Sequence, residues 1–300
     1  MELERTLVIQ AQNLLHEAGI DSAESEIRQL LEFATTTKQF NDLVAKRCLR
    51  IPLQHLIGKA YFRHLALDVG PGVFVPRPET ELLAQSGIDF VRILMNTQLV
   101  EAPVKSELRK PIVFDLCSGS GAVAISVATE VANVSVHAVE VSTAAVGWLL
   151  KNVETYSNQI DENNSRVTVH CLDATDREKF RKWSGQADVV LVNPPYIPND
   201  MVPKDPEVRE HDPHLALFGG PDGLDVPLAV AATAADLLTP GGLLVMEHAD
   251  VQGEGDSGLP AGLRKLLDAN GNRIWDSVTD HHDYNALPRY TTAIRTQNRN

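Results

Sequence analysis

The second part of the chain alternates short apolar runs with helical patterns, and no other feature of the sequence constrains the fold as strongly. Helical stripes occupy the stretches between the runs, one of them over residues 226–238. Strand–helix alternation of this kind predicts an α/β fold, with a mostly parallel sheet covered by helices on both faces. The five clearest apolar runs are residues 112–116, 134–139, 167–171, 189–192 and 243–246, and residues 274–278 and 290–294 could add two more strands.

Composition places the chain among globular proteins of one large domain or two unequal ones. It has 300 residues, of which 43% are hydrophobic and 22% charged, so a disordered or collagen-like chain is excluded. Cys48, Cys117 and Cys171 form no CxxC pair, and neither a disulfide framework nor a cysteine zinc site is indicated. The first residues lack the apolar core of a secretory signal, and no apolar run is long enough to cross a bilayer. We therefore expect a cytoplasmic protein.

The net charge of −13 is unevenly distributed along the chain. Residues 1–80 carry nine basic and ten acidic side chains, which leaves nearly the whole negative charge on the remainder. A strongly acidic body repels phosphate backbones at long range. We therefore expect no direct nucleic-acid substrate, although the charge balance leaves room for a local basic groove.

The N-terminal 75 residues lack the strand–helix alternation of the second part of the chain. The first 50 are helical in pattern, and residues 21–24 resemble a capping box at the start of one helix. The apolar residues Phe62, Leu65, Leu67 and Val69 precede Gly70-Pro71-Gly72 and the apolar residues 73–75 follow it, which predicts a β-hairpin around that turn. A helix should open within Pro76-Arg-Pro-Glu-Thr-Glu81. We expect residues 1–75 to form a small helical domain with a hairpin linker, and residues 76–300 a second domain.

Three further stretches have less distinctive patterns. Residues 97–111 look like a polar linker, and the glycine-rich residues 252–262 like a surface loop or a mobile lid. Five basic residues near the hairpin could be a solvated helix face or a docking site for a partner: Lys46, Arg47, Arg50, Lys59 and Arg63.

A glycine-rich turn and two acidic residues point to a nucleotide-type site. Asp115-Leu-Cys-Ser-Gly-Ser-Gly121 follows the first strand, and its glycines allow the backbone to turn sharply and to approach a ligand closely. Glu140 ends the second strand, where a carboxylate can accept both ribose hydroxyls. Asp173 follows the third strand and could accept from an adenine amino group. Because ligands bind at the carboxyl edge of such sheets, the ordered series favours a ligand site over ordinary strand-to-helix turns. An NAD enzyme fits less well, since Cys117 occupies the place of the first glycine of GxGxxG.

Asn193-Pro-Pro-Tyr196 follows the fourth strand and therefore lies at the same edge. The two prolines fix the backbone, so the Asn193 side chain and the neighbouring carbonyls point in set directions. A carboxamide oxygen and a backbone carbonyl form a pair of acceptors that matches a planar NH₂ group. Tyr196 offers a flat face on which an amide or a base can stack.

With these motifs the sequence resembles class I S-adenosylmethionine-dependent methyltransferases, and more narrowly the bacterial release factor glutamine N5-methyltransferases. The resemblance covers nearly the whole chain and is carried by residues 50–54, 72–81 and 212–217 as well as by NPPY. It implies a Rossmann-like, mostly parallel seven-stranded sheet preceded by a helical substrate-docking domain. It also implies methylation of the side-chain amide nitrogen of the glutamine in the Gly-Gly-Gln motif of peptide chain release factors.

Carried over residue by residue, the resemblance implies three groups of site residues. The catalytic residues would be Asn193, Pro194 and Tyr196, and the glutamine side chain would be held by Asn193, Pro194, Pro195 and Tyr196. Two positions depart from the pattern: Cys117 stands where glycine is frequent, and Ala174 has no large side chain to cover an adenine. The cofactor-binding residues would be Asp115, Cys117, Ser118, Gly119, Ser120, Gly121, Glu140, Asp173, Ala174 and Asn193.

The implied reaction is attack of the glutamine nitrogen on the sulfonium methyl, with S-adenosylhomocysteine as the second product. Acceptors at Asn193 and Pro194 would orient the NH₂ hydrogens and stabilise the positive charge as it develops. Two rival functions remain: an amino-group methyltransferase of DNA or RNA, and an adenosyl-ligand module that only docks to partners. The histidines at 211, 214, 281 and 282 follow no zinc spacing, so we expect no metal site.

Overall fold

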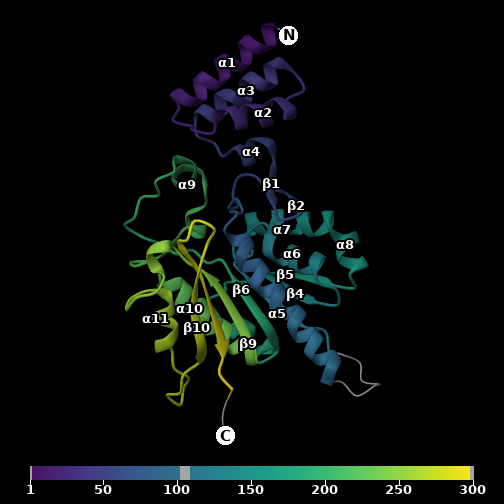
Figure 1. The fold of residues 1–300 in the computed structure, drawn as a ribbon, viewed down its shortest axis with the longest axis vertical. Coiled ribbons are helices and arrows are strands. Elements are labelled where there is room, and N and C mark those ends of the chain that lie inside the picture. Colours follow the sequence, from purple (N-terminus) through teal and green to yellow (C-terminus); the bar gives the residue numbers. More distant parts are fainter. Residues whose placement is uncertain (1, 102–108, 298–300) are drawn as a thin grey trace.

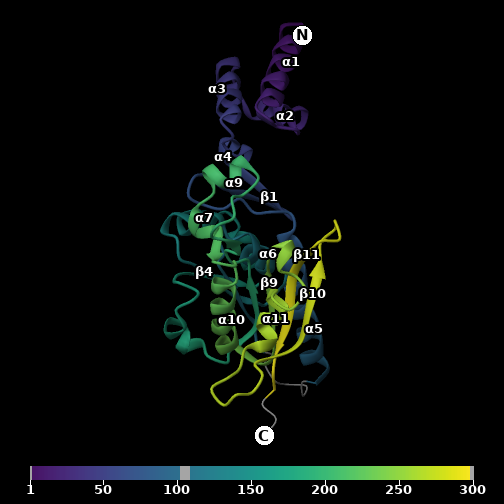
Figure 2. The same cartoon turned by 90° about the vertical axis from the view of Figure 1, so that its left-hand side faces the viewer.

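The computed structural model describes residues 2–101 and 109–297, and in it a small group of helices stands at one end of a large α/β unit (Figures 1 and 2). The N-terminal helices are α1 (Glu2–Glu17), α2 (Ala23–Phe33), α3 (Thr37–Cys48) and the short α4 (Leu53–Ile57). Their buried faces form one apolar cluster that includes Leu15, Ile27, Leu30 and Phe40. The amphipathic spacing read from the sequence thus produces a separate small core.

The α/β unit is built on one sheet of seven strands in the order β10-β11-β9-β6-β3-β4-β5. The five strands β5, β4, β3, β6 and β9 run parallel, and β11 is antiparallel to both β9 and β10. The predicted α/β fold with a mostly parallel seven-stranded sheet is confirmed. Its strands are β3 (Ile112–Leu116), β4 (Ser135–Glu140), β5 (Arg166–Cys171), β6 (Ala187–Val192), β9 (Leu238–Glu247), β10 (Trp275–His282) and β11 (Pro288–Arg295).

Helices cover both faces of this sheet, as Figure 1 shows, because alternate strand residues are apolar on both sides. Val113, Val189 and Val245 face the core under α5 and α6, whereas Phe114 and Val190 face the core under α10. The helices and 3-10 helices of the unit are α5 (Thr80–Glu101), α6 (Ala122–Glu130), α7 (Thr143–Thr155), α8 (Ser157–Glu162), η1 (Arg177–Trp183), α10 (Asp225–Leu237), η3 (Asp250–Gln252) and α11 (Leu259–Lys265).

The predicted hairpin exists, but its turn lies elsewhere. Strand β1 (Lys59–Phe62) pairs with β2 (Leu65–Asp68), so the chain reverses at Arg63 and His64 and not at Gly70–Gly72. Arg63 adopts a left-handed φ of 53° at this reversal. The apolar residues 73 and 75, taken for the second strand, instead pack with Val69, Ala60 and Ala145 in a small cluster beside α7. Their apolar character reflects packing, not strand pairing.

Three other local expectations are corrected. Ser22 makes no side-chain capping bond to α2 and donates instead to Glu26, so the predicted capping box is absent. The stretch 252–262 is not simply a surface loop, because Gln252 and the start of α11 are buried. Helix α5 continues through Glu101, and the remainder of the linker expected over 97–111 lies largely outside the described residues.

The segment between β6 and α10 connects the two parts of the molecule. It forms β7 (Ile197–Pro198), α9 (Pro206–His211), η2 (His214–Ala216) and β8 (Phe218–Gly220), and Figure 1 shows α9 close to α4. Glu207 of α9 forms ion pairs with Arg47 and Arg50, with a distance of 2.7 Å between guanidinium nitrogen and carboxylate oxygen in each. Arg47 also pairs with Glu26 at 2.5 Å. The basic stretch seen in the sequence is therefore, at these positions, neither a solvated face nor a free docking surface.

Candidate active site

The register of the sheet brings the predicted site residues to one edge. Leu116 of β3 lies beside Val139 of β4 and Val192 of β6, and Val192 lies beside Met246 of β9. One position further along, the chain reaches Cys117 after β3, Glu140 at the end of β4, Asn193 after β6 and Glu247 at the end of β9. These four residues come from four neighbouring strands and form one row at the carboxyl edge, where parallel sheets bind ligands.

The turn after β3 has the backbone that its glycines were expected to supply. Gly119 and Gly121 have φ values of 54° and 89°, and Cys117 has a φ of 64°, a left-handed conformation that is costly for a residue with a Cβ. A Cβ on Gly119 would meet open space, whereas a Cβ on Gly121 would collide with the Leu149 side chain. The first glycine thus leaves room at the edge, and the second permits α6 and α7 to pack.

Two buried carboxylates hold this turn in place. Asp115 accepts the backbone N–H of Ala124 at 3.0 Å, and its burial raises its pKa to about 7. Glu140 accepts the N–H of Gly119 at 2.9 Å through one oxygen and that of Ser142 at 2.8 Å through the other. Because a carboxylate has about four acceptor positions, Glu140 retains acceptor capacity for hydroxyl groups of a ligand.

The two serines of the turn serve its own geometry. The Ser118 hydroxyl donates to the Asp115 carbonyl at 2.7 Å, and the Ser118 N–H donates to the Val139 carbonyl at 2.9 Å. The Ser120 carbonyl accepts from the Asn152 side chain of α7 at 2.9 Å. Both serines are buried, and their contact with a cofactor remains a prediction.

Asp173 and Ala174 follow β5 near the same edge. Asp173 is exposed, and one of its oxygens accepts both the N–H and the hydroxyl of Thr175, at 2.8 and 2.7 Å. Ala174 is buried in the core beneath α10, with Val139 and Phe180. Their placement beside an adenine remains a prediction.

The Asn193–Tyr196 segment is held firmly from two sides. Gln252 donates to the Tyr196 carbonyl at 2.9 Å and to the Asp222 carbonyl at 3.1 Å. Strand β8 crosses so closely that a Cβ on Gly219 would lie 2.5 Å from the Pro195 carbonyl oxygen. The stiffness expected from the two prolines is therefore reinforced by tertiary contacts.

Side-chain hydrogen bonds link Asn193 to residues that sequence reasoning missed. Asn193 Nδ2 donates to Thr80 Oγ1 at 3.1 Å, and Thr80 Oγ1 donates to Glu247 Oε2 at 2.7 Å. The Tyr196 hydroxyl donates to Glu247 Oε1 at 3.2 Å. Burial raises the pKa of Glu247 to about 7 and that of Tyr196 above its ordinary range. Glu247 directly follows the fifth predicted strand, residues 243–246, and so occupies the same kind of position as Glu140.

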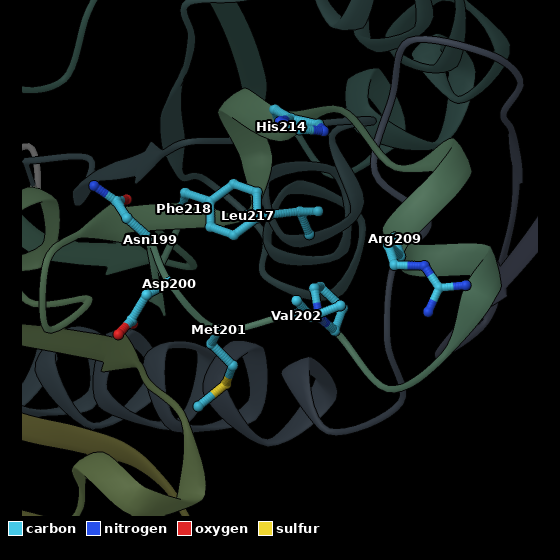
Figure 3. A pocket seen from close by; sticks show the side chains of 9 residues that line it. Asn199, Asp200, Met201, Val202, Arg209, His214, Leu217 and Phe218 are labelled. Atoms are coloured by element: carbon cyan, nitrogen blue, oxygen red, sulfur yellow. The ribbon is translucent and has the colours of Figure 1, made fainter.

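A pocket is formed by residues that follow the NPPY segment in the sequence. It has a volume of about 240 Å³, and Figure 3 shows Met201 and Val202 on one side and Leu217 and Phe218 on the other. Its lining comes from residues 199–218 and includes none of the predicted site residues.

Within residues 2–101 and 109–297, no helix is long and apolar enough to cross a membrane. In the same ranges no group of three His, Cys, Asp or Glu side chains is arranged to hold a metal ion. His248, next to Glu247, is fully buried and pairs with Asp280 at 3.0 Å, as expected for a packed histidine.

Comparison with known proteins gives matches over nearly the full length. A release factor glutamine methyltransferase of Streptomyces coelicolor is 40% identical over 95% of this chain and 96% of its own length. One from Bifidobacterium longum is 38% identical over 83% and 88%, respectively. A 4-amino-L-phenylalanine/4-methylamino-L-phenylalanine methyltransferase of Streptomyces pristinaespiralis is 37% identical over 71% of this chain and 66% of its own.

Two other similarities carry less information. Residues 98–214 match the family described as conserved hypothetical protein 95, which names no activity. A solved 16S rRNA N2 G1207 methyltransferase of T. thermophilus aligns with a TM-score of 0.45 and 12% identity, covering 80% of this chain and 44% of that one, too low a similarity to support an inference. The identity and coverage of the curated relatives are decisive: the chain belongs to the release factor glutamine methyltransferase family.

Proposed function

We propose that this protein methylates the side-chain amide nitrogen of the glutamine in the Gly-Gly-Gln motif of peptide chain release factors, with S-adenosylmethionine as methyl donor. The observation that carries the proposal is the row of Cys117, Glu140 and Asn193 at one sheet edge, in a chain that aligns with release factor glutamine methyltransferases over nearly its whole length. A function in translation also supports a cytoplasmic location.

The turn after β3 fits the donor. The open space at Gly119 allows close approach of a ligand, and Glu140 has acceptor capacity left for ribose hydroxyls. We assign the donor to Asp115, Cys117–Gly121 and Glu140, with Asp173 and Ala174 toward the adenine and Asn193 toward the methyl-bearing end. Bound there, S-adenosylmethionine supplies a methyl group activated by a sulfonium.

The NPPY segment fits a planar amide. Asn193 Oδ1 and the Pro194 carbonyl would accept the two N–H bonds of the glutamine NH₂ and orient its nitrogen. An amide nitrogen is a weak nucleophile because its lone pair is delocalised, so fixed acceptors stabilise the positive charge that develops on it. Orientation by the rigid segment lowers the entropic part of the barrier. Pro195 and Tyr196 would form the wall against which the amide plane lies.

We further propose that residues 1–75 dock the protein substrate and that residues 76–300 carry the chemistry. The ion pairs of Glu207 with Arg47 and Arg50 fix the helical part relative to the segment that follows NPPY. A substrate bound by the N-terminal helices would therefore be presented to the site in a defined orientation.

A methyl-transfer assay with three acceptors tests the proposal. Purified protein and labelled S-adenosylmethionine are incubated separately with release factor, with nucleic acid, and with 4-amino-L-phenylalanine, the compound named for one relative. We expect label on release factor alone, lost when the Gly-Gly-Gln glutamine is replaced by glutamate. Label on nucleic acid or on the amino acid alone would refute the proposal, as would donor binding without transfer to any acceptor.

A further inference from the structure

Asn193, Thr80, Glu247 and Tyr196 are connected by a chain of side-chain hydrogen bonds. Asn193 contacts Thr80, Thr80 contacts Glu247, and Tyr196 contacts the other oxygen of Glu247. Thr80 and Glu247 are buried, with exposed fractions of 4% and 2%, so water does not readily substitute for these partners. The direction of each bond is therefore set by the protein.

That direction depends on Glu247. An ionised carboxylate only accepts, so Thr80 and Tyr196 must both donate their hydroxyl hydrogens to it. Thr80 has one hydrogen and has then used it, so toward Asn193 its oxygen can only accept. The amide must consequently turn its NH₂ to Thr80, which leaves Oδ1 as the atom available to a substrate.

We infer that Thr80 and Glu247 are positioning residues which fix the orientation of the Asn193 carboxamide, so that Oδ1 and not Nδ2 meets the substrate NH₂. This inference rests on the proposed function. With the opposite orientation the site would place a donor against a donor. Thr80 belongs to the stretch Pro76-Arg-Pro-Glu-Thr-Glu81, far from NPPY in sequence. Its hydrogen bonds to Asn193 and Glu247 give a physical reason for a hydroxyl group at this position.

Protonation of Glu247 disturbs the chain. A neutral carboxyl must donate one hydrogen, and if Thr80 accepts it the Thr80 hydroxyl is free to donate to Asn193, which favours the opposite amide orientation. Burial raises the pKa of Glu247 to about 7. The groups that act on it are Thr80, the first residue of α5, Glu79 directly before it, Tyr196 after β6, and Arg289 of β11. Arg289 opposes the rise in pKa and Glu79 adds to it. The ionised, productive state therefore gains population as pH rises through about 7.

Steady-state kinetics of Thr80→Val, Thr80→Ser and Glu247→Gln test the inference. Thr80→Val keeps the shape of the side chain but removes the hydroxyl, so kcat on release factor should fall by roughly tenfold to a hundredfold. The KM for S-adenosylmethionine should change by less than about twofold, since most of the residues assigned to the donor belong to the turn after β3 and to Glu140, which Thr80 does not contact. Thr80→Ser restores the hydroxyl and should recover most of the rate.

The pH profile separates positioning from a structural role. The wild-type kcat should rise between about pH 6 and 8, whereas Glu247→Gln, whose NH₂ must donate at every pH, should be slow and flat. Wild-type kcat in Thr80→Val, or a wild-type pH rise in Glu247→Gln, would overturn the inference.

A readout without substrate separates this inference from the proposed function. The Asn193 side-chain NH₂ signals in the ¹⁵N NMR spectrum, assigned from their loss in Asn193→Asp, should show hydrogen-exchange protection in wild type and Thr80→Ser and lose it in Thr80→Val. Unchanged protection in Thr80→Val would refute the inference. If protection is lost only in Thr80→Val, as expected, but the wild type does not methylate release factor, only the proposed function is refuted.

Discussion

Replacement of Gly121 by alanine tests whether the turn after β3 has the geometry described. Gly121 has a φ of 89°, and the new methyl would collide with Leu149 and lie 3.1 Å from Ile125 Cδ1. The left-handed conformation costs about 1–2 kcal/mol for a residue with a Cβ, and overpacking of a core costs about 1–3 kcal/mol. The reduced entropy of the unfolded chain offsets about 0.4–1 kcal/mol. We expect a net loss of about 2–4 kcal/mol in the free energy of unfolding.

Urea denaturation followed by tryptophan fluorescence measures this loss, because Trp148, Trp183 and Trp275 all lie in the α/β unit. Gly147→Ala is the matched control: Gly147 is an exposed residue inside α7, and a Cβ there meets nothing. The control should stabilise the protein by up to about 1 kcal/mol. Equal effects of the two substitutions, or a Gly121→Ala variant as stable as wild type, would refute the close packing of the turn against α7.

Three more outcomes are expected. Asn193→Ala should lose at least about a hundredfold in kcat while donor affinity, measured by calorimetry, stays within a few-fold; a fully active variant would contradict the assignment. Glu26→Ala removes one of the carboxylates that pair with the buried guanidinium of Arg47 and should cost about 3 kcal/mol in urea denaturation, whereas Glu24→Ala on the exposed side of α2 should leave the denaturation midpoint close to that of wild type. The carboxyls of Asp115 and Glu247, whose pKa values are raised to about 7, bind protons more tightly in the folded state, so stability should fall as pH rises from about 5 to 7. Asp115→Asn should flatten that dependence, and an unchanged slope would contradict the raised pKa.

The sheet could be predicted from sequence because both of its faces are buried. Strands covered on two sides are continuous apolar runs, as in residues 189–192 of β6, and the helices between them have their own period. The edge residues Glu140 and Asn193 could be identified because each stands at the end of a strand and also belongs to a recognised pattern, the glycine-rich turn with its acidic partner and NPPY, respectively. The same rule applied to Glu247, but a carboxylate without a recognised motif did not stand out among 40 acidic residues.

Other features depended on tertiary contacts that no local pattern encodes. The turn of the hairpin lies at Arg63 because Arg63 is anchored by Glu130 at 2.6 Å, while the Gly70 turn is needed for close packing on Trp148. The role of Thr80 requires α5 to lie against the end of β9, more than 160 positions later in the chain. The pairing of Arg47 with Glu207 likewise joins parts that are distant in sequence.

A crystal structure with S-adenosylhomocysteine and a Gly-Gly-Gln peptide would test the central claim most directly. We predict the donor product over the turn after β3, with its ribose at Glu140, and the glutamine nitrogen within hydrogen-bonding distance of Asn193 Oδ1 and the Pro194 carbonyl. A donor product bound away from that turn, or a glutamine that meets Asn193 through Nδ2, would contradict the account.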